Sequence, residues 1–357
     1  MPARTRPRTP AGRRGRGRTA AAITLTAAVT AGAATLLTGC ASTVAVGAGA
    51  PGAAGGGASA PAGSASASGS SSARPAPSGS GSGSAAPVLN GTADNRLTIS
   101  DGTSTVVMNG GTVDFGTVVR DLAWNPTGTK AAFIDGSGNL DVANADGTGR
   151  VMVARAPGGE NWSHPTWQVT PYKKESGVPA GSLLYFAAAK GGVSRLKSVA
   201  STAVNGTPQV MGVDAGVGTG TTVPVTGNAW PSAGGTFGNA LFANAAAGEV
   251  YLRDDYLREQ TAPLARGSEP SISPDGDTAA FVRSVDGHDH LFVESLQDDR
   301  VAKDLTPNAT TDYTEPAWSP DGRTIAVRVP DGVATLPADG SAAPTRISSV
   351  TGLPAYR

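Results

Sequence analysis

The sequence predicts an all-β protein, a six-bladed β-propeller, with five blades as the alternative. Its clearest unit is residues 315–327, Glu-Pro-Ala-Trp-Ser-Pro-Asp-Gly-Arg-Thr-Ile-Ala-Val, in which a Ser-Pro-Asp-Gly turn separates two apolar strands. Proline presets the backbone at the second position of such a turn, and glycine takes the left-handed conformation that returns the chain. The unit recurs at residues 269–281 and, more loosely, at residues 121–133. A repeated strand–turn–strand unit of this kind is typical of propeller blades.

The spacing of the repeats predicts the size of a blade. Each copy has one anchor residue ahead of its turn, and the five anchors are Trp124, Trp167, Trp230, Ile272 and Trp318. The longer interval between the second and third anchors indicates an insertion. Residues 94–357 shared among six blades give roughly 44 residues each, within the range of about 40–45 that such repeats have.

The two ends of this region are predicted to complete one blade together. Residues 353–357, Leu-Pro-Ala-Tyr-Arg, repeat the start of the unit at residues 315–319. Three strands expected at residues 96–100, 104–109 and 112–117 precede the first full unit and have no innermost partner. We expect the C-terminal strand to pair with them, because such a closure removes the free strand edges that an open array leaves.

The Pro-x-Trp strand with its Ser-Pro-Asp-Gly turn resembles the WD40-like repeat of TolB-type β-propellers. Residues 273–276 and 319–322 match that turn in full, and residues 125–128 match it loosely. The resemblance implies a periplasmic or extracytoplasmic protein whose propeller face docks partner peptides. The sequence departs from that family because no α/β domain is recognisable ahead of the propeller, which argues against a complete TolB-like role.

The first 40 residues follow the plan of a bacterial export signal. Seven arginines fall in the first 18 residues, an apolar run follows from about residue 19 to residue 37, and Leu37-Thr38-Gly39-Cys40 resembles a lipobox. In bacterial lipoproteins this cysteine is acylated with diacylglycerol and becomes the mature N-terminus. The alternatives are an ordinary signal peptide or an uncleaved anchor. Arg13-Arg14 leaves the twin-arginine export route open beside the general one.

Residues 41–93 are predicted to be a disordered linker, because a tract so rich in Gly, Ser, Ala and Pro cannot bury enough apolar surface to fold.

The chain has 28 basic and 28 acidic residues, but the basic residues of the leader offset an acidic remainder of the chain. An acidic body argues against nucleic acid as a partner. Cys40 is the only cysteine, so no internal disulfide or cysteine metal cluster is possible.

Candidate binding residues stand three positions before each anchor. They are Asp121, His164, Gly227, Glu269 and Glu315, with Leu353 in the incomplete sixth copy. If the anchor strand is innermost, we expect Asp121, His164, Glu269 and Glu315 to ring one mouth of the central channel. There they would bind a basic segment of a partner or a cation, and the clustered acids would raise one another's pKa. The alternative is that these carboxylates only solvate the mouth.

Catalytic and metal chemistry find little support. The folded part has no Gly-x-Ser-x-Gly nucleophile turn, and the chain has three histidines. His288-Asp289-His290 is expected to be a solvated loop and no metal site. The anchor tryptophans are expected to pack between blades, whereas Trp162 lies off the repeat register and is expected to make a surface contact.

These features predict a lipid-anchored, extracytoplasmic, monomeric propeller. It would act without catalysis or cofactor as an interaction scaffold for an envelope protein or peptide. The alternative is a propeller enzyme or a glycan-binding propeller that uses the channel mouth.

Lipid labelling tests the anchor. Radiolabelled fatty acid should enter the wild-type protein and should not enter Cys40→Ala, because the thiol is the acylated group. Equal labelling of the two proteins would contradict the lipobox interpretation.

Overall fold

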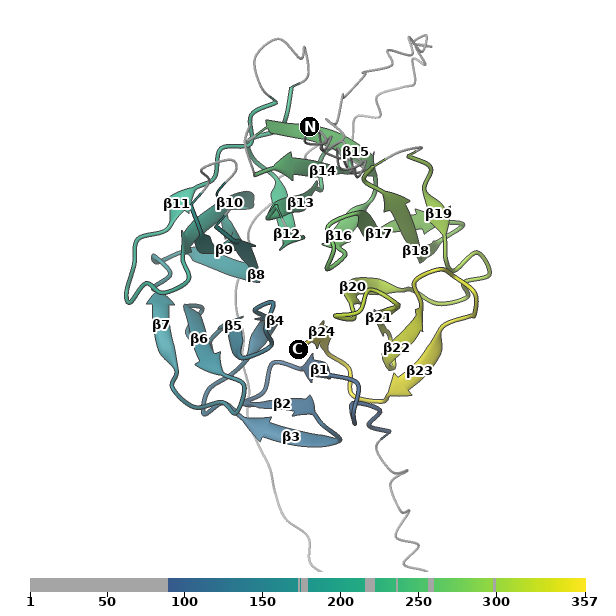
Figure 1. Ribbon diagram of the computed structural model, residues 1–357, viewed down its shortest axis with the longest axis horizontal. Helices are drawn as coiled ribbons and strands as arrows, with labels where there is room; N and C mark the ends of the chain where they lie inside the picture. Colours follow the sequence, from purple (N-terminus) through teal and green to yellow (C-terminus); the bar gives the residue numbers. More distant parts are fainter. Residues whose placement is uncertain are drawn as a thin grey trace, which may run out of the picture. The chain divides into compact units, whose positions relative to one another are not determined.

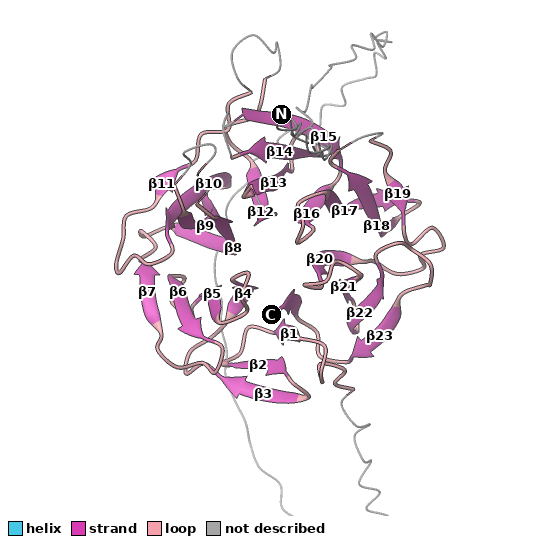
Figure 2. Ribbon diagram, in the orientation of Figure 1, coloured by secondary structure: helices cyan, strands magenta, loops and turns pink. Residues whose placement is uncertain are grey.

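The computed structural model describes residues 89–357, except 173, 175–178, 216–221, 236, 256–259 and 298–299. Within these residues the regular secondary structure is strand, arranged as six four-stranded antiparallel sheets around a common centre (Figures 1 and 2). The predicted six-bladed propeller is confirmed, and the five-bladed alternative is wrong. The predicted signal peptide with Cys40 and the predicted linker up to residue 88 lie outside the described residues. None of the described segments is a helix that could cross a membrane.

Each blade consists of four strands, named in order from the innermost to the outermost. The first contains β24 (Leu353–Tyr356), β1 (Leu97–Ser100), β2 (Thr105–Met108) and β3 (Gly111–Asp114); the second, β4 (Arg120–Trp124), β5 (Lys130–Ile134), β6 (Leu140–Asn144) and β7 (Val151–Ala154). The third contains β8 (Glu160–Thr170), β9 (Gly181–Lys190), β10 (Val193–Ala200) and β11 (Gln209–Val210); the fourth, β12 (Asn228–Gly234), β13 (Asn239–Asn244), β14 (Glu249–Asp254) and β15 (Gln260–Arg266). The fifth contains β16 (Ser268–Ile272), β17 (Thr278–Val285), β18 (His288–Ser295) and β19 (Lys303–Asp304); the sixth, β20 (Thr314–Trp318), β21 (Thr324–Val329), β22 (Gly332–Pro337) and β23 (Thr345–Ser348).

The Ser-Pro-Asp-Gly turn is closed by its own serine. In the sixth blade the Ser319 hydroxyl donates to Asp321 at 2.6 Å and accepts the Thr324 backbone N–H at 2.9 Å. Gly322 has a φ of 69° and donates its N–H to the Ser319 carbonyl. Because the side chain completes the bonds that the tight turn leaves open, this four-residue motif reliably ends the innermost strand of a blade.

Indole N–H groups join neighbouring blades. Trp124 donates to the Thr98 hydroxyl at 2.9 Å, and Trp167 donates to the Ala123 carbonyl at 3.0 Å. Trp318 likewise donates to the carbonyl of Ser271 at 3.1 Å. In each case the acceptor lies on the preceding blade. The prediction that these three anchors pack between blades is confirmed.

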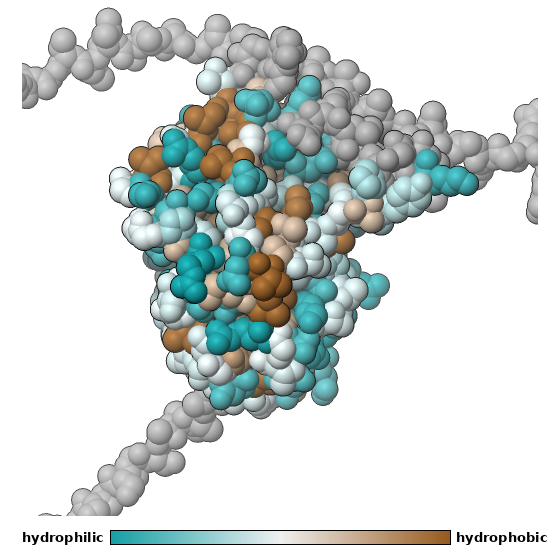
Figure 3. All heavy atoms as spheres, turned by 90° about the vertical axis from the view of Figure 1, so that its left-hand side faces the viewer, coloured by the Kyte–Doolittle hydropathy of each residue, from teal (hydrophilic) through white to brown (hydrophobic). Residues whose placement is uncertain are grey.

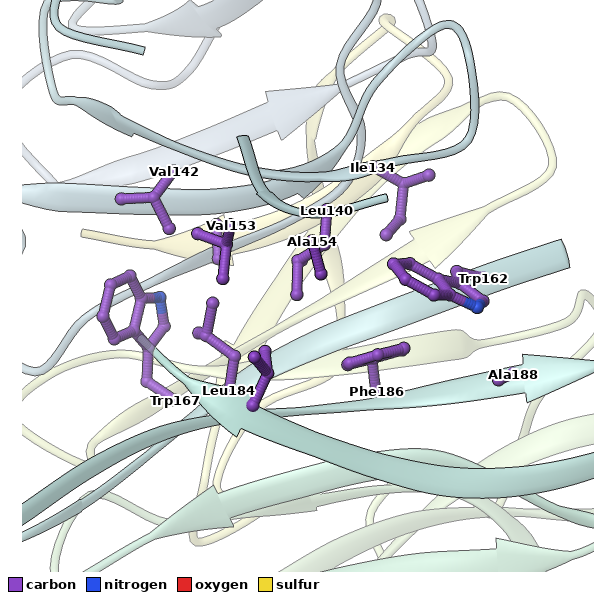
Figure 4. Close-up of a cluster of buried hydrophobic side chains, with 12 residues drawn as sticks. Ile134, Leu140, Val142, Val153, Ala154, Trp162, Trp167, Leu184, Phe186 and Ala188 are labelled. Atoms are coloured by element: carbon purple, nitrogen blue, oxygen red, sulfur yellow. The ribbon is translucent and has the colours of Figure 1, made fainter. Parts of the chain in front are cut away.

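Each blade face buries apolar side chains against its neighbour. Figure 4 shows one such layer, in which Leu140 and Val153 of the second blade face Leu184 and Phe186 of the third. Trp162 lies in this layer, fully buried, with its ring centroid 4.6 Å from that of Phe186. The prediction that Trp162 makes a surface contact is wrong. β8 begins several residues before the part of the strand that faces the channel, and Trp162 in this early part is covered by the apolar layer between the blades.

The outer surface of the propeller is mixed in character. Figure 3 shows hydrophilic and hydrophobic residues interspersed over the side of the ring that faces the viewer. The exposed large apolar residues of the described chain, such as Val193, Val204 and Val210 of the third blade, lie on outer strands and loops. The apolar layers between blades therefore hold the ring together, and its outer edge is left to solvent.

The two ends of the propeller region meet in the first blade. β24 pairs antiparallel with β1, with Leu97 opposite Tyr356 and Ser100 opposite Leu353. The Thr98 hydroxyl also donates to the Ala355 carbonyl at 2.8 Å. The predicted closure of the ring by residues from both ends is therefore confirmed.

Removal of residues 353–357 should lower the melting temperature by more than about 5 °C, because it exposes the edge of β1 and uncovers its buried apolar face. Thermal unfolding followed by circular dichroism measures the change. Removal of Arg357 alone, which leaves the β24–β1 strand pairing intact, is the matched control. An unchanged melting temperature after the longer deletion would contradict the closure.

Candidate functional site

Five innermost strands share one irregularity that turns a side chain into the channel. In β4, β8, β12, β16 and β20 the pairing with the next strand skips two residues, and the first skipped residue has a positive φ. These waist residues are Asp121 (54°), His164 (50°), Trp230 (50°), Glu269 (50°) and Glu315 (50°). Positive φ is uncommon for residues other than glycine and costs on the order of 1 kcal/mol. Its repetition in five blades makes it a regular part of the architecture.

The fourth blade corrects the predicted register. The sequence predicts Trp230 as an anchor and Gly227 as the channel residue, but Trp230 is the waist residue and Ala233 occupies the anchor position. The prediction fails because most of the other anchors are tryptophan, so the pattern also selects the tryptophan of the fourth blade as an anchor. A better signal is the proline that follows four of the five waist residues, in His164-Pro165, Trp230-Pro231, Glu269-Pro270 and Glu315-Pro316.

Two cavities meet at the waist. The large cavity has a volume of about 450 Å³ and lies where the innermost strands end in turns, so Pro126, Pro274 and Pro320 line its wall. The small cavity has a volume of about 330 Å³ and lies where these strands begin. Their shared lining residues are Asp121, His164, Glu315 and Leu353, whereas Glu269 and Trp230 line only the large cavity. The predicted ring therefore lies inside the channel and not at one mouth.

A hydrogen bond crosses the channel. His164 Nε2 donates to Glu315 Oε1 at 3.1 Å, and these residues come from the third and sixth blades, which lie opposite one another in the ring (Figure 1). The Trp230 indole N–H donates to the same oxygen at 3.3 Å. The ring centroids of His164 and Trp230 are 5.9 Å apart. His164 and Glu315, which line both cavities, form the partition between them, and Trp230 supports it from the large cavity.

The other two waist carboxylates connect consecutive blades. Asp121 Oδ2 accepts the backbone N–H of His164 at 3.1 Å, and Glu269 Oε2 accepts that of Glu315 at 2.7 Å. Each carboxylate thus holds the backbone of the waist residue on another blade. The two carboxyl groups are consequently fixed in place before any ligand arrives.

The waist changes its charge near neutral pH. Burial, and then the charge of Glu315, raise the pKa of Glu269 to about 7. Burial lowers the pKa of His164, but the hydrogen bond and charge of Glu315, with smaller contributions from Asp121 and Glu269, outweigh it and raise that pKa overall. A cation that reached Glu269 would favour its ionised form.

The histidine pair on the fifth blade is separate from this site. His288 and His290 lie on β18, so the prediction of a solvated loop is wrong, and the side chain of His290 is buried. His288 Nδ1 lies 3.3 Å from Asp312 and His290 Nδ1 lies 2.8 Å from Asp304. Among the described residues, no group of three or more His, Cys, Asp or Glu side chains is placed to hold a metal ion.

Comparison with known proteins adds the fold type. No protein-family model and no curated protein sequence matches the chain. TolB from Acinetobacter baumannii is similar in structure, with a TM-score of 0.52 and 16% identity over 75% of this chain and 68% of that one. This chain has a TolB-like propeller fold. The resemblance inferred from the turn motif is thereby confirmed at the level of the fold.

Other solved structures match this TolB-like chain with lower TM-scores. A putative TolB from Agrobacterium tumefaciens matches with a TM-score of 0.48 and 16% identity, over 66% of this chain and 82% of that one. A GH74 enzyme from Niastella koreensis matches with a TM-score of 0.45 and 14% identity, over 73% of this chain and 45% of that one. Likeness at these identities concerns the fold alone.

The TolB-like propeller should lose part of its stability as the pH rises from about 4.5 to about 7. In that window folded Glu269 still holds its proton while the unfolded chain has released it, so folding binds a proton whose contribution disappears above the folded pKa. Glu269→Gln keeps the neutral shape at every pH. Its free energy of unfolding relative to wild type should therefore rise between pH 4.5 and pH 8, by an amount on the order of 2 kcal/mol.

Glu249→Gln, an isosteric change in the fourth blade outside both cavities, is the matched control. Melting curves recorded at half-unit steps of pH give the comparison. A difference between Glu269→Gln and wild type that stays constant across the range would show that Glu269 does not titrate near neutral pH.

Proposed function

We propose that the large cavity docks a basic, extended segment of a partner protein, and that the chain is a non-catalytic interaction scaffold. The observation that carries this proposal is a cavity of about 450 Å³ with waist carboxylates at its inner end, whose described lining residues include one arginine, Arg357, and no lysine. That volume lies within the range of about 300–1,000 Å³ found for ligand sites.

The charge at the inner end of the cavity favours a cationic group. Glu269 is neutral below about pH 7 because it is buried beside Glu315, and a lysine or arginine side chain placed there would favour the ionised form of Glu269. Hydrogen bonds between ionised partners are roughly twice as strong as neutral ones. The Glu315 carboxylate already accepts two N–H donors, so donors can approach it from inside the channel.

The wall of the cavity favours an extended chain. Pro126, Pro274 and Pro320 come from the turns of three different blades, and together with Trp167 and Trp230 they offer flat apolar surfaces. Proline has no N–H, so the turns add few backbone donors. An apolar wall with charge at its inner end suits a segment whose basic side chain points inward and whose backbone lies along the channel.

The export signal supports a place for this scaffold outside the cytoplasm. In our proposal Cys40 carries the diacylglycerol, residues 41–93 tether the propeller to the membrane, and the partner is a protein or peptide of the envelope. In this proposal the propeller works as a monomer, because β24 pairs with β1 and completes the first blade from within the same chain.

One observation favours a second function. A carboxyl with a pKa of about 7 beside an ionisable carboxylate is also an arrangement that serves as an acid–base pair in glycoside hydrolysis. Glu269 would be the acid and Glu315 the base or nucleophile in such an enzyme. Turnover of an envelope glycan that Glu269→Gln abolishes would support the enzyme and overturn the scaffold.

Photo-cross-linking from the wall of the cavity identifies the partner. p-Benzoylphenylalanine at Pro320, which is exposed and lines the large cavity, should capture a discrete protein in cells. The same amino acid at Val301, an exposed residue of the fifth blade outside the cavity, is the control for random capture. Mass spectrometry should place the captured site next to a lysine or arginine.

The affinity of the captured segment then tests the role of the carboxylates. Replacing its basic residue by norleucine should weaken binding to the wild-type protein by at least about tenfold, since a hydrogen bond to a charged group contributes about 1.5–3 kcal/mol. The same replacement should have little effect on binding to Glu269→Gln combined with Glu315→Gln. Capture of acidic segments only, or an equal effect on both proteins, would overturn the proposal.

A further inference from the structure

Two arginines line the small cavity from either side of the first blade. Arg120 begins β4 in the second blade, and Arg328 lies in β21 of the sixth blade. The first blade, in which the chain ends pair, lies between them and contributes Ser100, Asp101 and Gly352 to the lining. The cavity thus has cationic groups on two sides of one blade.

The strand register shows that this charge is local. Arg120 immediately precedes its waist residue, and Arg328 is paired with Thr314, the equivalent residue of the sixth blade. At the same level the third, fourth and fifth blades pair Ser163 with Ala187, Ala229 with Ala243 and Ser268 with Val282. No charged side chain occupies this level on those three blades. The positive charge is confined to the part of the rim next to the first blade.

Hydrogen bonding in the cavity leaves donors without acceptors. Asp101 accepts the Thr103 N–H and hydroxyl, Asp121 accepts the His164 N–H, and Glu315 accepts the His164 and Trp230 side chains. Within the described residues, by contrast, neither Arg120 nor Arg328 has a side-chain hydrogen bond or ion pair. The hydroxyl of Ser100, a residue only 4% exposed, also has no partner there.

We propose that the small cavity binds an anionic group, a carboxylate or a phosphate, between Arg120 and Arg328. The planar guanidinium matches both groups, because it can give two parallel N–H donors to two oxygens. Asp121 and Glu315 lie deeper, at the waist, and repel any second negative charge. The ligand is therefore one whose single anionic group lies at one end, with a neutral or cationic remainder directed toward the waist.

The position of the cavity leaves two sources of such a group. The described chain begins beside it, since Leu89 and Asn90 bond to Ser349 and Ser348, and residues 351–353 line the cavity. A lipid headgroup phosphate and a free small anion share the same recognition chemistry. Neither arginine lines the large cavity, so the anion site stands even if no basic segment binds there.

Titration with inorganic phosphate at constant ionic strength tests the site. Saturable shifts of the Arg120 and Arg328 side-chain Nε–H signals are expected in NMR spectra, with no such shifts from added chloride. Arg120→Gln and Arg328→Gln should each weaken phosphate binding by at least about tenfold, because each removes a charge-assisted pair. Arg120→Lys should weaken it less, since it keeps the charge and loses the fork. Arg323→Gln, in the β20–β21 turn outside both cavities, is the matched control.

Vesicle binding separates the two sources. If the source is a headgroup, vesicles containing phosphatidylglycerol should bind the full chain carrying Cys40→Ala. This binding should depend on Arg120 and Arg328, and inorganic phosphate should compete with it. Phosphate binding without vesicle binding assigns the site to a free anion. Absence of saturable shifts, or unchanged phosphate binding by a folded Arg120→Gln, Arg328→Gln double variant, would overturn the proposal. The two single variants give the same comparison if the double variant does not fold.

Discussion

The pairing of β24 with β1 is the constraint on which the channel depends. Because the last strand of the chain completes the first blade, six sheets form a closed ring and no blade can tilt away independently. Closure fixes the distance between opposite blades, and that distance brings His164 within 3.1 Å of Glu315. Without it there would be no partition, and the two cavities would not have separate linings. The chemistry of the waist is therefore a consequence of how β24 meets β1.

The two cavities differ in what they leave unsatisfied. At the inner end of the large cavity, burial and the charge of Glu315 raise the pKa of Glu269 to about 7. At the rim of the small cavity, the carboxylates are already bonded and two guanidinium groups have no acceptor among the described residues. The propeller thus presents opposite binding preferences at the two ends of one channel. The His164–Glu315 hydrogen bond lies between them.

Much of this could be predicted from the sequence because the repeat unit is local. The Ser-Pro-Asp-Gly turn closes through its own side chain, so its structure follows from four residues, and the blade size and the closing strand follow from its spacing. The waist carboxylates follow from a fixed offset to the anchors. By the same reasoning Trp230 is wrongly assigned to an anchor position. Its size favours that assignment, whereas Pro231 marks Trp230 as a waist residue. The proximity of Arg120 and Arg328 could not be foreseen, since it depends on which strands of non-adjacent blades share a level.

The bulge that forms the waist also bears on how such a channel can change. Each of the five waist side chains points inward because its backbone has a positive φ, whatever the side chain is, and carboxylate, imidazole and indole already occupy these places. The direction of the side chain is thus separated from its chemistry. Substitutions here alter the lining without moving a strand, so five positions are available for giving one unchanged framework a new ligand preference.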